Sequence, residues 1–140
     1  MKKVAVVFWS GTGNTEAMAE AVVKGAQGAG ASVEKNAASD FGPSDVDRYD
    51  AIAFGCPAMG SEQLEDSEFE PMFDSVKGSL RGKTIALFGS YGWGDCEWMR
   101  NWEEECKAAG AVLACDSMTA NDAPDDAAVD ACKSLGAALA

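Results

Sequence analysis

Five short apolar runs separated by helical patterns are the feature that most limits how this chain can fold. The first, Val4–Trp9, is almost continuously apolar, which is typical of a strand buried on both faces. A weaker run begins at Val33, and the others are residues 51–55, 84–90 and 111–115. The first helical pattern begins at Thr15, and three others cover residues 69–80, 98–106 and 124–139. Five strands alternating with four helices predict an α/β fold, a parallel sheet with helices on both faces.

Local signals mark the ends of the first predicted helix. Asn14 or Thr15 can cap its start, and Gly28 and Gly30 are expected to end it. No repeat, linker or low-complexity segment interrupts the pattern over the 140 residues. We therefore expect residues 1–140 to form a single domain around one core.

The charge balance limits the partners. There are 23 acidic residues against 11 basic ones, a formal net charge of −12. We expect no nucleic acid partner, because binding nucleic acid begins with Lys and Arg neutralising phosphates. A basic protein is favoured as a partner, because its charge is opposite to that of this chain. No apolar run approaches the roughly 18 residues of a membrane span. Met1–Lys3 leads into a short apolar run without a cleavage signal, so we expect no signal peptide and a cytoplasmic protein.

The cysteine and histidine content excludes several kinds of site. The chain has five cysteines, no CxxC motif and no histidine, which gives a zinc or iron–sulfur site little support. We expect most of the thiols to be small buried hydrophobes in a reducing compartment. The absence of histidine also removes the commonest general base and the usual partner of a Ser or Cys nucleophile.

The loop after the first strand, Ser10–Thr15 (SGTGNT), has the chemistry of a phosphate site without a cation. Gly11 and Gly13 let backbone N–H groups turn inward, and the following helix adds its positive end. A P-loop needs a Lys, which does not follow until Lys24, and a dinucleotide motif needs a Gly where Glu16 stands. The alternative is a turn that only caps the helix. The polar side chains available are Ser10, Thr12, Asn14 and Thr15.

Two further strand ends carry unusual loops. After the third strand, Met59–Glu62 resembles a tight turn. The acids there and beyond it would alone indicate a solvated surface: Glu62, Glu65, Asp66, Glu68 and Glu70. After the fourth strand, Gly89–Asp95 (GSYGWGD) places aromatics among glycines, which suits a platform for a flat ring, although Trp93 taken alone is as often structural. Trp98 and Trp102 lie at helical spacing and are predicted core residues.

Together the three loops resemble those of a known family. WSGTGNT, GCPAMGSE and GSYGWGD, in this order, are similar to the loops of short-chain flavodoxins of anaerobic bacteria, and the resemblance covers essentially the whole chain. It implies a three-layer flavodoxin-like fold, with a five-stranded parallel sheet in the order 2-1-3-4-5 and helices on both faces. It also implies one non-covalent FMN. The length leaves no room for the insertion that long-chain flavodoxins carry in the last strand.

The resemblance implies a role for each loop. The FMN phosphate would lie in Ser10–Thr15, and Met59 and Trp93 would flank the isoalloxazine ring. Gly60 would offer its carbonyl to flavin N5, and Glu62 would meet N3. The residues expected to bind the cofactor are Ser10, Gly11, Thr12, Gly13, Asn14, Thr15, Ala58, Met59, Gly60, Ser61, Glu62, Ser90, Tyr91, Gly92, Trp93, Gly94, Asp95 and Asn121. No catalytic residue and no metal site are expected.

Two departures from the family pattern occur in the loop after the third strand. Pro57 stands where some short-chain members carry a Ser that helps to bind the phosphate. Ser61 stands where some relatives have Asp or Asn. The hypothesis for the first electron is that the Gly60–Ser61 peptide flips to accept a hydrogen bond from N5, and the residue at 61 biases that flip. For the second electron, Glu62, Glu65 and Asp66 are expected to lower the potential.

The function implied by the resemblance is electron transfer and not enzymatic catalysis. The protein would be a low-potential one-electron carrier that cycles between semiquinone and hydroquinone. As a monomer, it would dock basic-faced reductases, and oxidoreductases that otherwise use ferredoxin, on its acidic flavin edge. One alternative is an NAD(P)H-dependent FMN or quinone reductase of the same fold, which a stacked Trp93 disfavours. A phosphoacceptor receiver domain, whose required Asp and Lys are missing, and an FMN-binding scaffold module are less favoured.

Overall fold

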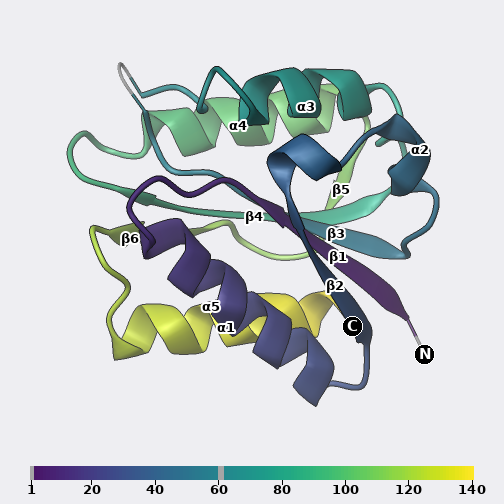
Figure 1. Ribbon diagram of the computed structural model, residues 1–140, viewed down its shortest axis with the longest axis horizontal. Helices are drawn as coiled ribbons and strands as arrows, with labels where there is room; N and C mark the ends of the chain where they lie inside the picture. Colours follow the sequence, from purple (N-terminus) through teal and green to yellow (C-terminus); the bar gives the residue numbers. More distant parts are fainter. Residues whose placement is uncertain (1, 60–61) are drawn as a thin grey trace.

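Helices cover both faces of one sheet (Figure 1). Helices α3 (Phe69–Lys77) and α4 (Glu97–Ala108) lie on one side, and α1 (Asn14–Gly28) and α5 (Asp126–Leu139) lie on the other. The computed structural model describes residues 2–59 and 62–140. None of the helices within these ranges is both long and apolar enough to cross a membrane. In chain order the elements are β1 Lys3–Phe8, α1 Asn14–Gly28, β2 Ser32–Ala37, the 3-10 turn η1 Ala38–Asp40, α2 Pro43–Val46, β3 Ala51–Gly55, α3 Phe69–Lys77, β4 Thr84–Tyr91, α4 Glu97–Ala108, β5 Val112–Leu113, β6 Met118–Asn121 and α5 Asp126–Leu139.

The strand order confirms the expected topology. Neighbouring strands run β2-β1-β3-β4-β5 and every pair is parallel. In the register, Phe8 pairs with Gly55 and Gly55 pairs with Phe88. The carboxyl ends of β1 and β3 are therefore level with the middle of β4, and the loops that follow these strands leave at one edge of the sheet. This is the edge at which parallel α/β sheets bind ligands.

The fifth strand differs from the continuous run predicted over residues 111–115. Only Val112–Leu113 pairs there with β4, and β6 takes over farther along β4. Ile85 pairs with Leu113 and Phe88 with Met118, so three steps along β4 face five on the partner chain. A regular ladder cannot hold two additional residues, so the chain leaves the sheet between β5 and β6.

Both faces of strand β1 are buried, as its apolar run predicts. The four residues of Val4–Val7 are each 0% exposed. Their side chains alternate between two core clusters: Val4 and Val6 pack toward α1 and α5, while Ala5 and Val7 pack toward α3 and α4. Trp98 and Trp102 are buried in the second cluster, which confirms their predicted place in the core.

Helices α1 and α5 pack backbone against backbone. A Cβ atom on Gly136 would overlap the carbonyl oxygen of Val22, and one on Gly25 would overlap that of Lys133. Glycine at these two positions therefore sets the distance between the helices. The predicted end of α1 is also confirmed, because the helix ends at Gly28 and Gly30 takes a left-handed φ of 100°.

One acidic residue has a structural function that its sequence context did not reveal. Glu65, predicted to belong to a solvated acidic surface, is only 4% exposed. Its carboxylate accepts hydrogen bonds from the backbone N–H groups of Ser67, Glu68 and Phe69, each at 2.8 Å, at the start of α3. Burial raises the pKa of Glu65, but the hydrogen bonds from Ser67, Phe69 and Glu68 outweigh burial and hold that pKa below its usual value.

The close α1–α5 contact predicts a large cost for one added methyl group. Gly136→Ala should lower the free energy of unfolding by roughly 1–3 kcal/mol, because the helices must separate. Urea denaturation measures this. The matched control is Gly28→Ala, where a Cβ meets no atom within 4 Å. It should be neutral or stabilising by up to about 1 kcal/mol, and equal stabilities of the two variants would contradict this packing.

The Glu65 cap predicts a pH-dependent loss of stability. Glu65→Gln should lower the free energy of unfolding at pH 7 by about 1–2 kcal/mol, since an amide offers one acceptor and no charge. A carboxyl with a lowered folded pKa stabilises fully above its unfolded pKa of about 4.3 and loses this contribution as the pH falls through the folded value. The difference from wild type should therefore shrink below about pH 4. Denaturation at pH 7, 5 and 3 tests this, and a constant difference would count against it.

Candidate functional site

A cavity of about 220 Å³ opens where the loops after β1, β3, β4 and β6 meet. Most of the residues that line it were expected at the cofactor site: Ser10, Gly11, Thr12, Asn14, Thr15, Ala58, Met59, Ser90, Tyr91 and Gly92. Trp9, Pro57 and Asp122 also line it and were not in the predicted set. The parallel strands therefore bring together four segments that are far apart in the sequence.

The loop Ser10–Thr15 gathers donors around one oxygen atom. Gly13 has a φ of 94° and precedes the first residue of α1. The Oγ of Ser10 accepts hydrogen bonds from the backbone N–H groups of Gly13, at 3.1 Å, and Glu16, at 3.2 Å. Two N–H groups at a helix N-terminus thus converge on one acceptor, and a phosphate oxygen suits the same donors. The geometry and chemistry of this loop fit a phosphate monoester.

The expected cap by Asn14 or Thr15 is wrong. Both residues lie inside α1, because the left-handed Gly13 holds the position before the helix. Gly13 has no side chain that could cap the helix. The hydroxyl of Ser10, which precedes the helix, accepts the N–H groups of Gly13 and Glu16 instead. Thr15 is instead buried and turned toward β4. Sequence spacing did not reveal this, because the distant strand decides where the Thr15 hydroxyl points.

A buried pair of hydroxyl groups joins this loop to β4. The Oγ1 of Thr15 lies 3.0 Å from the Oγ of Ser90, and the residues are 1% and 5% exposed. Both side chains line the cavity. One hydroxyl hydrogen is used between the two oxygens, so the other is available to an acceptor in the cavity.

The donor set of the cavity carries no positive charge. Among the described residues that line it, none is Lys or Arg. Neutral hydroxyls and N–H groups suit a phosphate that is held, whereas phosphoryl transfer calls for cations that stabilise developing charge. The residues present therefore fit the phosphate of a permanently bound nucleotide cofactor.

Asp122 is a lining residue that the motif analysis missed. It takes a φ of 56°, and its N–H donates to the carbonyl of Tyr91 at 2.7 Å, which holds it beside the end of β4. Asn121, the predicted residue, instead lines a neighbouring cavity with the start of α5. The available signal was the position directly after a strand, together with the tolerance of Asp for left-handed backbone.

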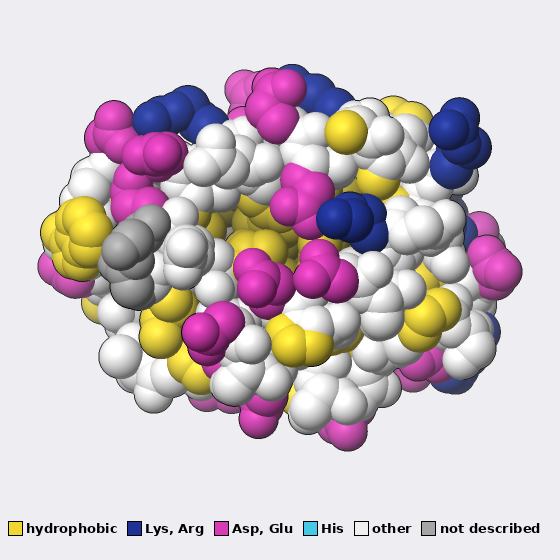
Figure 2. Space-filling view, turned by 90° about the horizontal axis from the view of Figure 1, so that it is seen from above, with side chains coloured by type: hydrophobic (Ala, Val, Ile, Leu, Met, Phe, Trp, Pro, Cys, Tyr) yellow, Lys and Arg dark blue, Asp and Glu magenta, His cyan; other side chains and the backbone are white. Residues whose placement is uncertain are grey.

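The two residues expected to flank the flavin ring are exposed. Met59 is 38% exposed and lines the cavity, and Trp93 is 66% exposed and lies outside the lining. The space-filling view shows acidic side chains next to exposed hydrophobic ones (Figure 2). Met59 and Gln63 exchange two backbone hydrogen bonds, at 2.8 and 2.9 Å, around the expected turn. The expected contacts of Gly60 and Ser61, and the peptide flip between them, lie outside the described residues.

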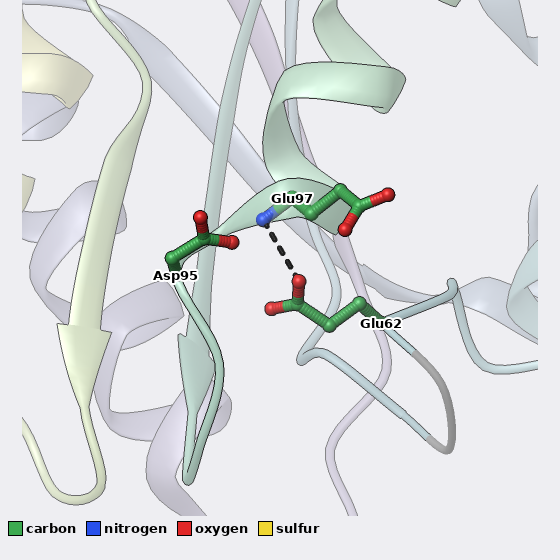
Figure 3. Close-up of side chains that lie close together, drawn as sticks. All are labelled: Glu62, Asp95 and Glu97. Atoms are coloured by element: carbon green, nitrogen blue, oxygen red, sulfur yellow. Dashed lines mark hydrogen bonds between the residues drawn. The ribbon is translucent and has the colours of Figure 1, made fainter.

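Glu62 joins the loop after β3 to the start of α4. One carboxylate oxygen accepts the N–H of Glu97 at 3.2 Å, and the other is buried without a partner among the described residues (Figure 3). The carboxylates of Glu62, Asp95 and Glu97 offer oxygens within 4.8 Å of one another. A Cβ on Gly94 would overlap the Glu62 carboxylate. Glu62, Gly94 and Asp95 do not line the cavity, so their expected flavin contacts stay predictions.

The cysteines largely fit the expected role of small buried hydrophobes. All five are free thiols; Cys56, Cys106 and Cys132 are buried, and Cys96 and Cys115 are partly exposed. Burial raises the pKa of Cys56 and Cys106 to about 12 and that of Cys132 to about 11. These three thiols are therefore protonated and unreactive at neutral pH.

Comparison with known proteins agrees with the geometry of the site. The flavodoxin family model matches residues 6–136. The chain is 47% identical to the flavodoxin of Megasphaera elsdenii over 98% of each sequence. It is 43% identical to that of Clostridium beijerinckii over 96% of this chain and 97% of the relative. The solution structure of two-electron reduced Megasphaera elsdenii flavodoxin covers 97% of each chain with a TM-score of 0.89.

These matches extend over nearly the whole chain and include all the loops that form the cavity. They favour the electron carrier over the reductase, the receiver domain and the scaffold module. The chain therefore belongs to the flavodoxin family, whose members are electron-transfer proteins that carry FMN and exchange electrons with redox proteins.

Proposed function

We propose that this chain binds FMN with the 5′-phosphate in Ser10–Thr15 and the ring beside Met59 and Trp93, and that it carries single electrons at low potential. The observation that carries this proposal is the cation-free set of converging donors at the start of α1. The one-electron chemistry belongs to the flavin. The residues of the chain bind the cofactor, orient it and set the electrostatic field around it.

The neutral phosphate site explains retention of the cofactor without cleavage. Backbone N–H groups, the dipole of α1 and the hydroxyls of Thr15 and Ser90 would share the phosphate charge. No cation is positioned among the described lining residues to assist displacement at phosphorus. A tightly held monoester is therefore the ligand that this set of groups favours.

The exposed apolar side chains support the ring placement. Leaving Met59 and Trp93 in water forfeits the free energy that burying apolar surface supplies, about 25 cal/mol per Å². A flat aromatic ring beside the cavity would cover part of both side chains. The expected ring and ribityl contacts of Ser90, Tyr91 and Gly92 suit the same placement, since these residues line the cavity.

The proposed partners are basic-faced redox proteins that dock at this acidic edge. The net charge of −12 and the carboxylates of Glu62, Asp95 and Glu97 create a negative field there. Opposite charge on a partner speeds encounter, and added salt weakens the effect within a Debye length of about 10 Å at 0.1 M. We also propose a cytoplasmic location, because free thiols suit a reducing compartment.

The phosphate placement predicts a selective loss of affinity. Thr15→Val keeps the shape of the side chain and removes its hydroxyl, so the Kd for FMN should rise by roughly 10- to 100-fold, as for a hydrogen bond to a charged group. Riboflavin lacks the phosphate, and its Kd should change little. Titration of the apoprotein by flavin fluorescence measures both. Thr84→Val, at the opposite end of β4, is the control, and equal losses for FMN and riboflavin would refute the placement.

The acidic edge predicts a shift in the reduction potential. Stepwise dithionite titration should show two separate one-electron steps, and Glu62→Gln or Asp66→Asn should raise the second potential by roughly 20–40 mV each after screening. Asp47→Asn, next to the amino end of β3, should leave it unchanged. A single two-electron step, or rapid NADH oxidation with a quinone, would favour the reductase. An unchanged second potential would contradict the electrostatic explanation.

A further inference from the structure

The indole of Trp98 contacts two segments next to the cavity, one just after β3 and one at the end of β4. Its Nε1 donates a hydrogen bond to the carbonyl of Cys56 at 3.2 Å, and its ring lies 5.8 Å from that of Tyr91. Cys56 leads directly into the lining residues 57–59, and Tyr91 is itself a lining residue. Trp98 is 2% exposed and does not line the cavity. One buried side chain of α4 therefore contacts two of the segments that form the cavity without lining the cavity itself.

The contact between Trp98 and Cys56 is closely packed. A Cβ on Gly89 would overlap the Cys56 carbonyl oxygen and would lie 3.2 Å from the Trp98 ring. Cys56 is 0% exposed, its N–H donates to the carbonyl of Phe88 at 3.1 Å, and its Sγ accepts the N–H of Glu65 at 3.3 Å. The direction of the Cys56 carbonyl is thus fixed from several sides. A substitution at Trp98 would therefore alter the position of Cys56 and of the residues that follow it as far as Met59.

We propose that Trp98 is a positioning residue for FMN. Its N–H bond to Cys56 and its ring contact with Tyr91 hold the loop 57–59 and the loop 91–92, which both line the cavity, in place relative to each other. A cofactor held between two loops binds best when the loops are already at the right separation, because no free energy is spent in ordering them. This inference rests on the proposed FMN site.

The chain contains a matched control for this role. Trp102 lies one turn further along α4 and is 1% exposed. Its ring packs at 5.4 Å from Phe69 and 5.7 Å from Phe73, in the interior of the same core cluster. Its Nε1 has no hydrogen-bond partner among the described residues. Trp102→Phe therefore removes as much ring volume as Trp98→Phe. Among the described residues, it breaks no hydrogen bond of the indole.

The first measurement is FMN binding and amide hydrogen exchange in the two variants. Trp98→Phe should raise the Kd for FMN about five- to tenfold, the effect expected of one lost hydrogen bond, and Trp102→Phe should change it less than about twofold. In the apoprotein, the N–H groups of Ala58 and Met59, bonded to Ser90 and Gln63, should exchange faster in Trp98→Phe. The amide of Val6 in the buried strand β1 reports global unfolding, so each rate is compared with it.

Equal effects of the two variants on FMN affinity, or on the exchange of Ala58 and Met59 relative to Val6, would overturn the proposal. If the wild-type chain failed to bind FMN, the proposed function would fall, while exchange in the apoprotein would still decide the role of Trp98. If Trp98→Phe did not fold, the wild-type indole N–H groups provide the test. FMN should slow the exchange of the Trp98 indole more than that of Trp102, and an equal response would overturn the proposal.

Discussion

The hydrogen-bond register of the parallel sheet is the constraint on which the rest of the structure depends. The pairing of Phe8 with Gly55, and of Gly55 with Phe88, brings the loops after β1, β3 and β4 to one edge. Because helices cover both faces, the middle of each interior strand is buried and apolar. The polar groups that can bind a ligand therefore lie at the carboxyl ends of the strands, in the loops that follow and in the first turn of α1, and the register decides which of them meet.

Contacts between segments that are distant in the sequence help to build the site. Thr15 meets Ser90 across 75 positions of sequence, Glu62 meets the N–H of Glu97 across 35, and Trp98 meets Cys56 across 42. Each contact joins a segment that borders the cavity to one held by a different strand or helix. Such cross-links restrict the loops before a cofactor arrives, which lowers the ordering cost of binding. The donors in the loop after β1 are arranged locally instead, since the N–H groups of Gly13 and Glu16 converge on Ser10 where Gly13 adopts left-handed backbone.

Burial divides one acidic run into different functions. Glu62 is partly exposed, and its charge adds to the negative field of the neighbouring Asp95 and Glu97 carboxylates. Glu65, three residues later, turns inward, caps α3 and is nearly inaccessible to solvent. Exposed carboxylates in the run remain available to a basic partner or to influence a reduction potential. A carboxylate whose oxygens are taken up by backbone N–H groups contributes to stability instead.

The sequence by itself determined the alternation of strands and helices, the core positions of Trp98 and Trp102 and the end of α1, because burial and periodicity are recorded locally. Its three loop motifs also identified the family and most of the cavity lining. The tertiary structure decided the break between β5 and β6, the use of Ser10 instead of Asn14 or Thr15 at the start of α1, the capping role of Glu65, and the approach of Asp122 in place of Asn121. In each case the outcome depends on which distant group a backbone or side-chain atom meets, and the spacing of residues along the sequence does not specify that partner.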